Sequence, residues 1–127
     1  MRLHQVALPV RDLARATAFY SDLLDSAPIA TYDPPGLVFF DLDGVRLLLD
    51  RQAGPGATIY LRVDDVQRVV AELAAKGVDV TEPAHVVFTD EDGTFGPAGE
   101  DEWLAGIRDS EGNLVCLAAR RPAKLAE

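Results

Sequence analysis

Two histidines and one cysteine are the most reactive side chains in this 127-residue sequence. His4 lies in residues 3–10, where apolar residues alternate as they do in a β-strand. Because strand side chains alternate between two faces, His4 shares one face with Val6 and Leu8, and Gln5 points to the other. The helix that follows this strand should cover the face of His4. The pattern therefore predicts that His4 is a structural or rim histidine.

His85 follows Pro83, and a proline interrupts the hydrogen bonding of a strand, so the register around His85 is left open. Two interpretations follow. In the first, His85 lies on an edge strand with one ring nitrogen in water. In the second, it lines a cavity and acts near neutral pH as a hydrogen-bonding or acid–base group, without a metal ion.

Cys116 could act as a nucleophile or a redox sensor if its surroundings lowered its pKa. Its neighbours Val115 and Leu117 are apolar, and no histidine is adjacent in the sequence. These features favour a buried, inert thiol. A single cysteine also excludes an internal disulfide.

Composition narrows the possible partners. The formal net charge is −9, and the 12 basic residues are scattered, which argues against a nucleic-acid-binding surface. No stretch approaches the roughly 20 apolar residues of a membrane span, and the chain opens with a strand pattern rather than a leader segment. We therefore expect one cytoplasmic domain over residues 1–127 that contacts neither nucleic acid nor membrane.

The first half of the chain predicts the order β-α-β-β-β. After residues 3–10, Asp12 is a candidate helix N-cap, and apolar residues at three- and four-residue spacing predict a helix that ends near Asp25. Strands are expected over 29–32, 37–42 and 45–49, and an Asp43-Gly44 turn joins the last two.

The same order is expected after a linker at residues 52–56. A strand over 58–63 leads to a helix that Asp64 and Gln67 could cap, and Lys76-Gly77 is a typical helix end. Further strands are expected over 78–81, 86–89, 103–107 and 114–118. The additional residues of this half fall within 90–102, which predicts a mobile acidic loop that could close over a ligand as a lid.

The two halves repeat one unit, because residues 5–13 align with 58–66 and residues 44–49 align with 112–117. The repeat units are residues 3–51 and 57–119. Together with the Asp-Ser-Glu-Gly-Asn sequence at 109–113, this pair of units resembles the vicinal oxygen chelate superfamily. That superfamily includes glyoxalase I, methylmalonyl-CoA epimerase, extradiol dioxygenases, and the bleomycin and fosfomycin resistance proteins.

The resemblance implies an α+β fold. In it, two βαβββ modules form an incomplete mixed β-barrel around a cavity, with the helices outside. It also implies a homodimer. Four positions correspond to the metal ligands of metal-dependent members, and they are occupied here by Gln5, Leu48, Thr58 and Cys116. Leucine cannot ligate a metal, so we expect neither a bound metal nor another cofactor.

Alternation along the strands, with the resemblance, predicts which side chains face the cavity. The predicted cavity residues are Gln5, Arg46, Leu48, Thr58, Tyr60, His85, Trp103 and Cys116. Trp103 and Phe39 could stack on a planar ligand. This mixture of apolar and polar groups is typical of a small-molecule pocket, although the protein's own side chains could also fill such a space.

Three functions are compatible with these features. The first is metal-independent binding of a small organic molecule. The second is an enzyme, namely a lyase, isomerase or dioxygenase, that uses an unusual metal site or the candidate catalytic residues His85 and Tyr60 with Gln5. The third is a partner-binding module whose cavity is vestigial.

Overall fold

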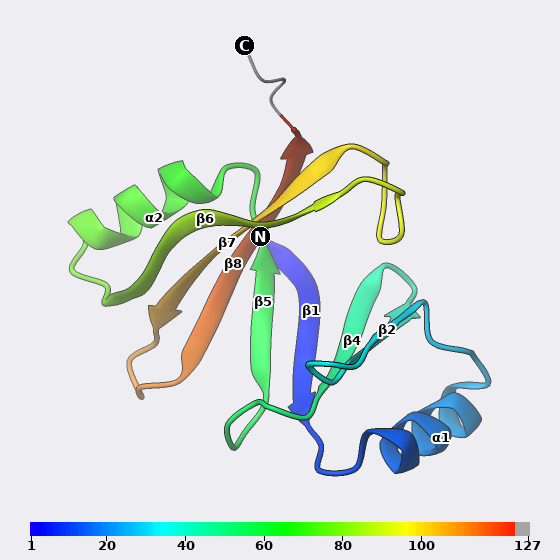
Figure 1. The fold of residues 1–127 in the computed structure, drawn as a ribbon. Coiled ribbons are helices and arrows are strands. Elements are labelled where there is room, and N and C mark those ends of the chain that lie inside the picture. The colour runs from blue at the N-terminus through cyan, green and yellow to red at the C-terminus, as the bar shows by residue number, and fades with distance from the viewer. Residues whose placement is uncertain (124–127) are drawn as a thin grey trace. The chain divides into compact units, whose positions relative to one another are not determined.

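The computed structural model describes residues 1–123 and confirms the α+β class (Figure 1). The chain divides into two compact units, which we call the N-terminal module (His4–Ile59) and the C-terminal module (Met1–Leu3 with the chain from Tyr60 onward). Each contains the predicted βαβββ order. The elements are β1 (Arg2–Pro9), α1 (Leu13–Leu24), β2 (Ala30–Tyr32), β3 (Leu37–Leu42), β4 (Val45–Asp50), β5 (Thr58–Arg62), α2 (Val66–Ala75), β6 (Val80–Asp90), β7 (Glu100–Arg108) and β8 (Leu114–Pro122).

The N-terminal module is a mixed sheet covered on one face by α1. Its strand order is β2-β3-β4-β1, with β1 and β4 parallel and the remaining pairs antiparallel. The buried core of this module lies between sheet and helix and consists of Leu13, Val38, Phe40, Leu47 and Leu49. Alternation along β4 therefore turns Arg46 and Leu48 away from α1.

The boundaries of α1 agree with the prediction. Asp12 accepts a hydrogen bond from the Arg15 amide at 3.0 Å and caps the helix. Asp25 ends it in the left-handed conformation, at φ 49°. The end of the helix is thus set by local chemistry that the sequence displays.

The C-terminal module repeats this arrangement in the strand order β5-β8-β7-β6. Helix α2 packs on one face, and the buried core beneath it consists of Val66, Ala105, Leu117 and Ala119. The predicted cap of this helix was wrong by one residue, because Asp65 and not Asp64 accepts the hydrogen bond from the Arg68 amide, at 3.1 Å. Both aspartates suit a cap, and the point at which the backbone turns into the helix selects Asp65.

The predicted break at Pro83 is also wrong, because β6 is one strand from Val80 to Asp90. In the order of its module β6 stands at the end, so the missing N–H of Pro83 costs no bond to β7. The pairing near Pro83 is nevertheless irregular, because the register between β6 and β7 shifts between Val80 and Glu82 and again between Glu82 and His85.

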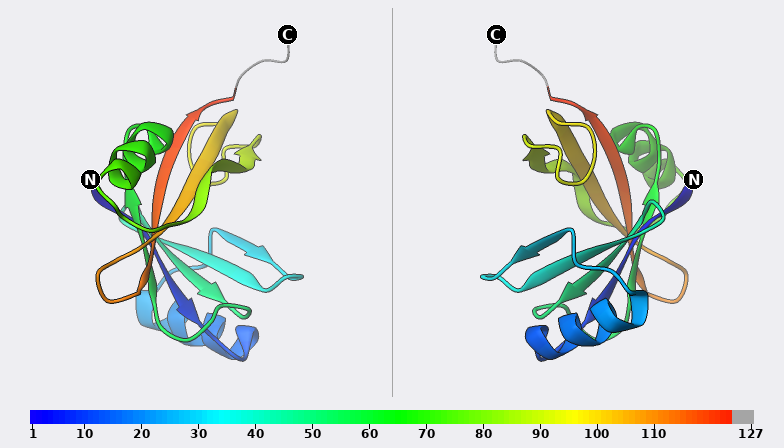
Figure 2. Two further views of the ribbon diagram at one scale, coloured as in Figure 1. Left: turned by 90° about the vertical axis from the view of Figure 1, so that its left-hand side faces the viewer. Right: turned by 90° about the vertical axis from the view of Figure 1, so that its right-hand side faces the viewer.

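The segment predicted as a mobile acidic loop is held by its own first residue. Asp90 is 5% exposed, and its carboxylate accepts hydrogen bonds from the amides of Thr94 and Phe95, at 2.8 and 2.9 Å. Its carbonyl oxygen accepts a further bond from the Gly99 amide at 2.8 Å. The loop is therefore residues 91–99, and it lies on the side of β6–β8 opposite α2 (Figure 2).

The Asp109–Asn113 segment, which contributed to the resemblance, is a turn between β7 and β8. The Asp109 carboxylate accepts hydrogen bonds from the backbone amides of Glu111 and Asn113, at 2.9 and 2.8 Å. Hydrogen bonds from Asn113 hold the pKa of Asp109 below its usual value. The side chains of Asp109 and Asn113 therefore stabilise this turn. Within residues 1–123, neither helix has the length and apolar character to cross a membrane.

Candidate functional site

In the N-terminal module, three of the predicted cavity residues share the face that points away from α1. Gln5 pairs with Arg46 across β1 and β4, and Ala7 pairs with Leu48 in the same ladder. Gln5 is 3% exposed, and its Oε1 atom accepts no hydrogen bond within the described part of the chain. Most buried polar atoms have a partner, so this oxygen is a ready acceptor for a ligand.

Arg46 adds a cation beside Gln5, and its side chain is held from two sides. Its Nη2 atom lies 3.1 Å from Nε2 of His4, and its guanidinium carbon lies 5.7 Å from the centre of the Phe39 ring. A guanidinium only donates, so Nε2 of His4 accepts and carries no proton. The Phe39 ring, which could stack on a planar ligand, meets the guanidinium of Arg46 on one face.

The expectation that alternation separates His4 from the cavity-facing residues is wrong for Arg46. His4 is 6% exposed and precedes Gln5, the ladder partner of Arg46, by one residue. The long arginine side chain can reach this position although its own Cα–Cβ bond points the other way. Alternation describes backbone direction, and it fails for contacts made by the ends of long side chains.

Thr58 begins β5 and is half-buried, and it falls in the N-terminal module, whereas Tyr60 falls in the C-terminal module. The structure thus groups Gln5, Arg46 and Leu48 in the N-terminal module, whereas Tyr60 and Cys116 belong to the C-terminal module.

In the C-terminal module, Tyr60 and Cys116 share the face opposite α2. They are joined by a side-chain hydrogen bond, and Cys116 is 8% exposed. Burial, and then the charge of Glu82, raise the pKa of the Cys116 thiol to about 11, although the bond with Tyr60 acts in the opposite direction. This environment is that of an inert thiol and not of a nucleophile.

A thiol-labelling experiment tests this conclusion. With a pKa of about 11, roughly one Cys116 in a thousand is a thiolate at pH 8, and burial slows access further. We expect the folded protein to react with Ellman's reagent at least ~100-fold more slowly than the chain unfolded in guanidinium. Similar rates in the two states would show that Cys116 is exposed or activated.

Trp103 does not share a face with Cys116, so its prediction as a member of the same cavity is wrong. The β7–β8 ladder pairs Trp103 with Ala119, and both pack in the core beneath α2. Cys116 pairs with Gly106, whose side of the sheet is the opposite one. The error arose because the pattern around 103–107 does not show which of its two alternating faces meets the helix.

His85 lies on the end strand β6, and its side chain is 39% exposed. Its Nδ1 atom donates to the Pro83 carbonyl at 2.8 Å, and Nε2 lies 3.5 Å from Oε1 of Glu82. Strands β7 and β8 separate β6 from β5, so His85 and Tyr60 start about 14 Å apart across the sheet. The two candidate catalytic residues therefore do not converge on one reacting atom.

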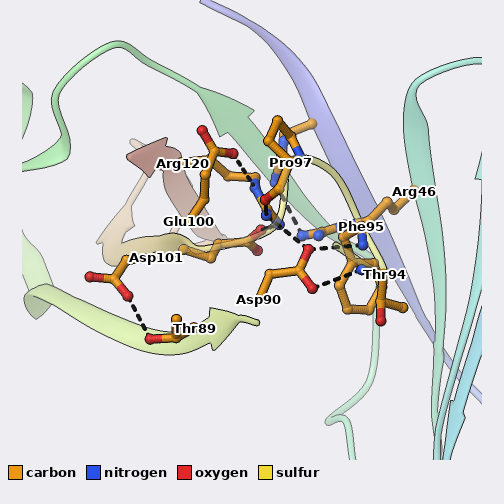
Figure 3. Close-up of polar contacts among 11 residues, drawn as sticks. Arg46, Thr89, Asp90, Thr94, Phe95, Pro97, Glu100, Asp101 and Arg120 are labelled. Carbon is orange, nitrogen blue, oxygen red and sulfur yellow. Dashed lines mark hydrogen bonds and ion pairs between the residues drawn. The ribbon is translucent and has the colours of Figure 1, made fainter. Parts of the chain in front are cut away.

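The main polar cluster of this module was missed from the sequence. Arg120 lies 2.8 Å from Asp90 and 3.1 Å from Glu100 (Figure 3), and it lies 3.5 Å from Glu102. The side chains of Arg120, Asp90 and Glu102 are only 3–4% exposed. We call these four residues the Arg120 cluster.

Hydrogen bonds stabilise the negative charge of Asp90 in the Arg120 cluster. Burial opposes ionisation of Asp90, but bonds from the Phe95 amide, the Arg120 guanidinium and the Thr94 amide hold its pKa below the usual value. A signal for the cluster was present in the sequence. Continued alternation from Cys116 through Ala118 reaches Arg120, but the strand was expected to end at residue 118 and β8 extends to Pro122.

The side chains at the four ligand positions do not fit a metal ion. Leu48 has no donor atom, the Cys116 thiol is protonated near neutral pH, and Thr58 offers a weak neutral hydroxyl. Within residues 1–123, no three His, Cys, Asp or Glu side chains are grouped so that they could hold a metal ion.

Comparison with known proteins identifies similar sequences and structures. A family model described as the Glyoxalase/Bleomycin resistance protein/Dioxygenase superfamily matches residues 2–117. A search of curated proteins gave no match.

Solved structures share the fold at low identity. A superfamily member from Vibrio splendidus is 16% identical, with a TM-score of 0.66 over 94% of this chain and 98% of that one. A protein from Legionella pneumophila described as an NAD-dependent benzaldehyde dehydrogenase is 20% identical, with a TM-score of 0.61 over 92% and 98%. The Mn(II)-bound glyoxalase from Novosphingobium aromaticivorans is 18% identical, with a TM-score of 0.69 over 98% of this chain and 42% of that one.

Proposed function

Because this chain belongs to the Glyoxalase/Bleomycin resistance protein/Dioxygenase superfamily, we propose that it binds a small organic molecule without a metal ion or other cofactor. The proposed site is the face of the N-terminal module that carries Gln5, Arg46 and Leu48. The observation that carries the proposal is the Oε1 atom of Gln5, a buried acceptor that has no donor within residues 1–123.

The side chains on this face indicate the chemistry of the ligand. Oε1 of Gln5 would accept a hydrogen bond from an N–H or O–H group, and the neighbouring Arg46 would favour an anionic or strongly polarised group. Leu48 would contact an apolar part of the same molecule. A carboxylic acid that carries a hydroxyl or amine on an apolar skeleton satisfies all three.

The enzymatic alternative has less support. Its candidate residues are dispersed, because Tyr60 on β5 is bonded to Cys116, and His85 lies on β6, with β7 and β8 between the two strands. A hydrolytic or isomerising step needs its acid–base group within hydrogen-bonding reach of the reacting atom. Within the C-terminal module, the separation of Tyr60 and His85 across the sheet keeps them from acting together on one reacting atom.

Metal analysis separates the two functions. We expect protein purified without chelator to contain less than ~0.1 equivalent of zinc, nickel, iron or manganese, because the donor set is deficient. Addition of each metal should leave the melting temperature unchanged within about 1 °C. Near-stoichiometric metal together with a rise in the melting temperature would contradict metal independence and favour an enzyme.

Replacement of Gln5 by leucine tests the site directly. Gln5→Leu removes a buried acceptor without a partner, so the free energy of unfolding should rise by about 1 kcal/mol. A library of small hydroxy and amino acids, screened by saturation-transfer NMR, should give ligands that bind the wild type and bind the variant at least ~10-fold more weakly. Gln52→Leu, at an exposed glutamine that lines neither proposed site, is the matched control. It should leave ligand affinity unchanged, and it should not raise the free energy of unfolding, because it loses the hydrogen bond from Nε2 to the Pro35 carbonyl. Ligands retained by Gln5→Leu would place the site elsewhere.

A further inference from the structure

A second concave site lies in the C-terminal module, on the α2 side of its sheet. It is a depression of about 460 Å³, within the range typical of small-molecule sites. The depression is lined by Asp65, Val66, Gln67, Val86, Asp101, Trp103, Arg121 and Pro122. It is distinct from the face of Gln5 and Arg46, which belongs to the other module.

The apolar part of this depression is formed by Trp103 and its ladder partner Val86. The Trp103 ring is half-buried, since it packs against the core beneath α2 and also lines the depression. Val86 is 40% exposed. An indole held in place by packing on one side offers a rigid surface to a flat or apolar group on the other.

The polar part carries more negative than positive charge. Oδ1 of Asp101 accepts a hydrogen bond from the Thr89 hydroxyl at 2.6 Å (Figure 3). The other carboxylate oxygen of Asp101 accepts no hydrogen bond within residues 1–123. Asp65 contributes a second carboxylate. Among the described residues that line the depression, Arg121 is the one base. It turns toward α2, with Nη1 3.8 Å from the Asp65 carboxylate and 3.4 Å from the Asp64 carbonyl.

We propose that this depression binds a small organic cation, whose ammonium pairs with Asp101 and whose apolar or aromatic group lies on Trp103. A carboxylate oxygen with an unused acceptor site suits an N–H of an ammonium, and the face of an indole attracts cations as well as aromatic groups. The net charge of −9 adds a general attraction for cations. The inference does not depend on the function proposed above, because the two sites share no residue.

Trp103 provides the measurement, because it is the only tryptophan in the chain. Benzylamine, benzyl alcohol and benzoate have similar shapes and carry positive, zero and negative charge at pH 7. We expect benzylamine to change the Trp103 fluorescence saturably, with a Kd of about 1–10 mM, as befits a fragment of this size. Benzyl alcohol should bind at least ~5-fold more weakly, and benzoate should not bind.

Two variants make the test specific. Asp101→Asn keeps the hydrogen bond from Thr89 but removes the charge, and it should weaken benzylamine binding at least ~5-fold. Asp79→Asn removes an equal charge from an exposed position outside the depression and should leave binding unchanged. Equal affinity for the three probes, or a preference for benzoate, would overturn the proposal. So would unchanged benzylamine binding in Asp101→Asn. The absence of any fluorescence response to 20 mM benzylamine, which is about twice the highest expected Kd, would also overturn it.

Discussion

Arg120→Met should lower the free energy of unfolding by about 3–5 kcal/mol, because it removes the cation from a cluster of buried carboxylates. Arg120 contacts Asp90, Glu100 and Glu102, and the Asp90 and Glu102 side chains are 4% and 3% exposed. Methionine retains the bulk of the side chain, so the loss reports charge and hydrogen bonding. Chemical denaturation at pH 7 measures the effect.

The matched control is Arg121→Met, because Arg121 is adjacent on β8 but 54% exposed. Its pair with Asp65, at 3.8 Å, is a surface pair, so the change should be within about 0.5 kcal/mol. Equal effects of the two substitutions would show that the Arg120 cluster is not a buried ion network.

The stability lost in Arg120→Met should depend on pH, and it should be larger at high pH than at low pH. In the wild type the pKa of Asp90 is lowered, so the stability from Asp90 is present above its unfolded-state pKa and is lost as pH falls through the folded value. In the variant, buried carboxylates without a cation have raised pKa values, so stability is lost as pH rises. The difference between the two proteins should therefore be smaller at pH 5 than at pH 8.

Phe40→Ala should lower the free energy of unfolding by a comparable ~3–5 kcal/mol. Phe40 is fully buried in the core beneath α1, and its ring centre lies 6.5 Å from that of Tyr20. Alanine removes apolar surface and leaves a cavity that the surrounding strands cannot close. Thermal and chemical denaturation both measure the loss.

Phe19→Ala is the control for Phe40→Ala, because Phe19 is 61% exposed although it also contacts Tyr20, at 5.2 Å between ring centres. It should cost no more than about 1 kcal/mol. A large loss from Phe19→Ala would indicate that a partner covers the exposed side of α1, as in the homodimer that the resemblance implies.

The secondary structure was largely predictable because its signals are local. Asp12 and Asp25 bound α1 through bonds to residues within four positions, and Gly77, at φ 85°, follows the end of α2. The cap at Asp65 depends on where the backbone turns into the helix, and the continuity of β6 through Pro83 depends on the place of β6 at the end of the strand order of its module. That information is not local.

That a ligand binds at Gln5, Arg46 and Leu48 stays a prediction, but alternation was sufficient to predict that these side chains share a face. Gln5, Arg46 and Leu48 share a face, as expected, because each strand has two faces and the packing of α1 selects one of them. Trp103 was assigned to the wrong face because an aromatic residue suits either side of a sheet. The contact between His4 and Arg46 was missed because the end of a long side chain is not confined to one face.

The amino-acid sequence was thus sufficient to establish the doubled βαβββ pattern, the superfamily and the lack of a donor at Leu48, since each depends on residue type and spacing. Folding was needed to show that Asp90 and Arg120, which are 30 positions apart, form a buried ion pair. Asp90 is bonded to several groups because a buried charge, which is removed from water, must find its partners within the protein. Those partners come from β7, β8 and the 91–99 loop, and the strand order brings them together.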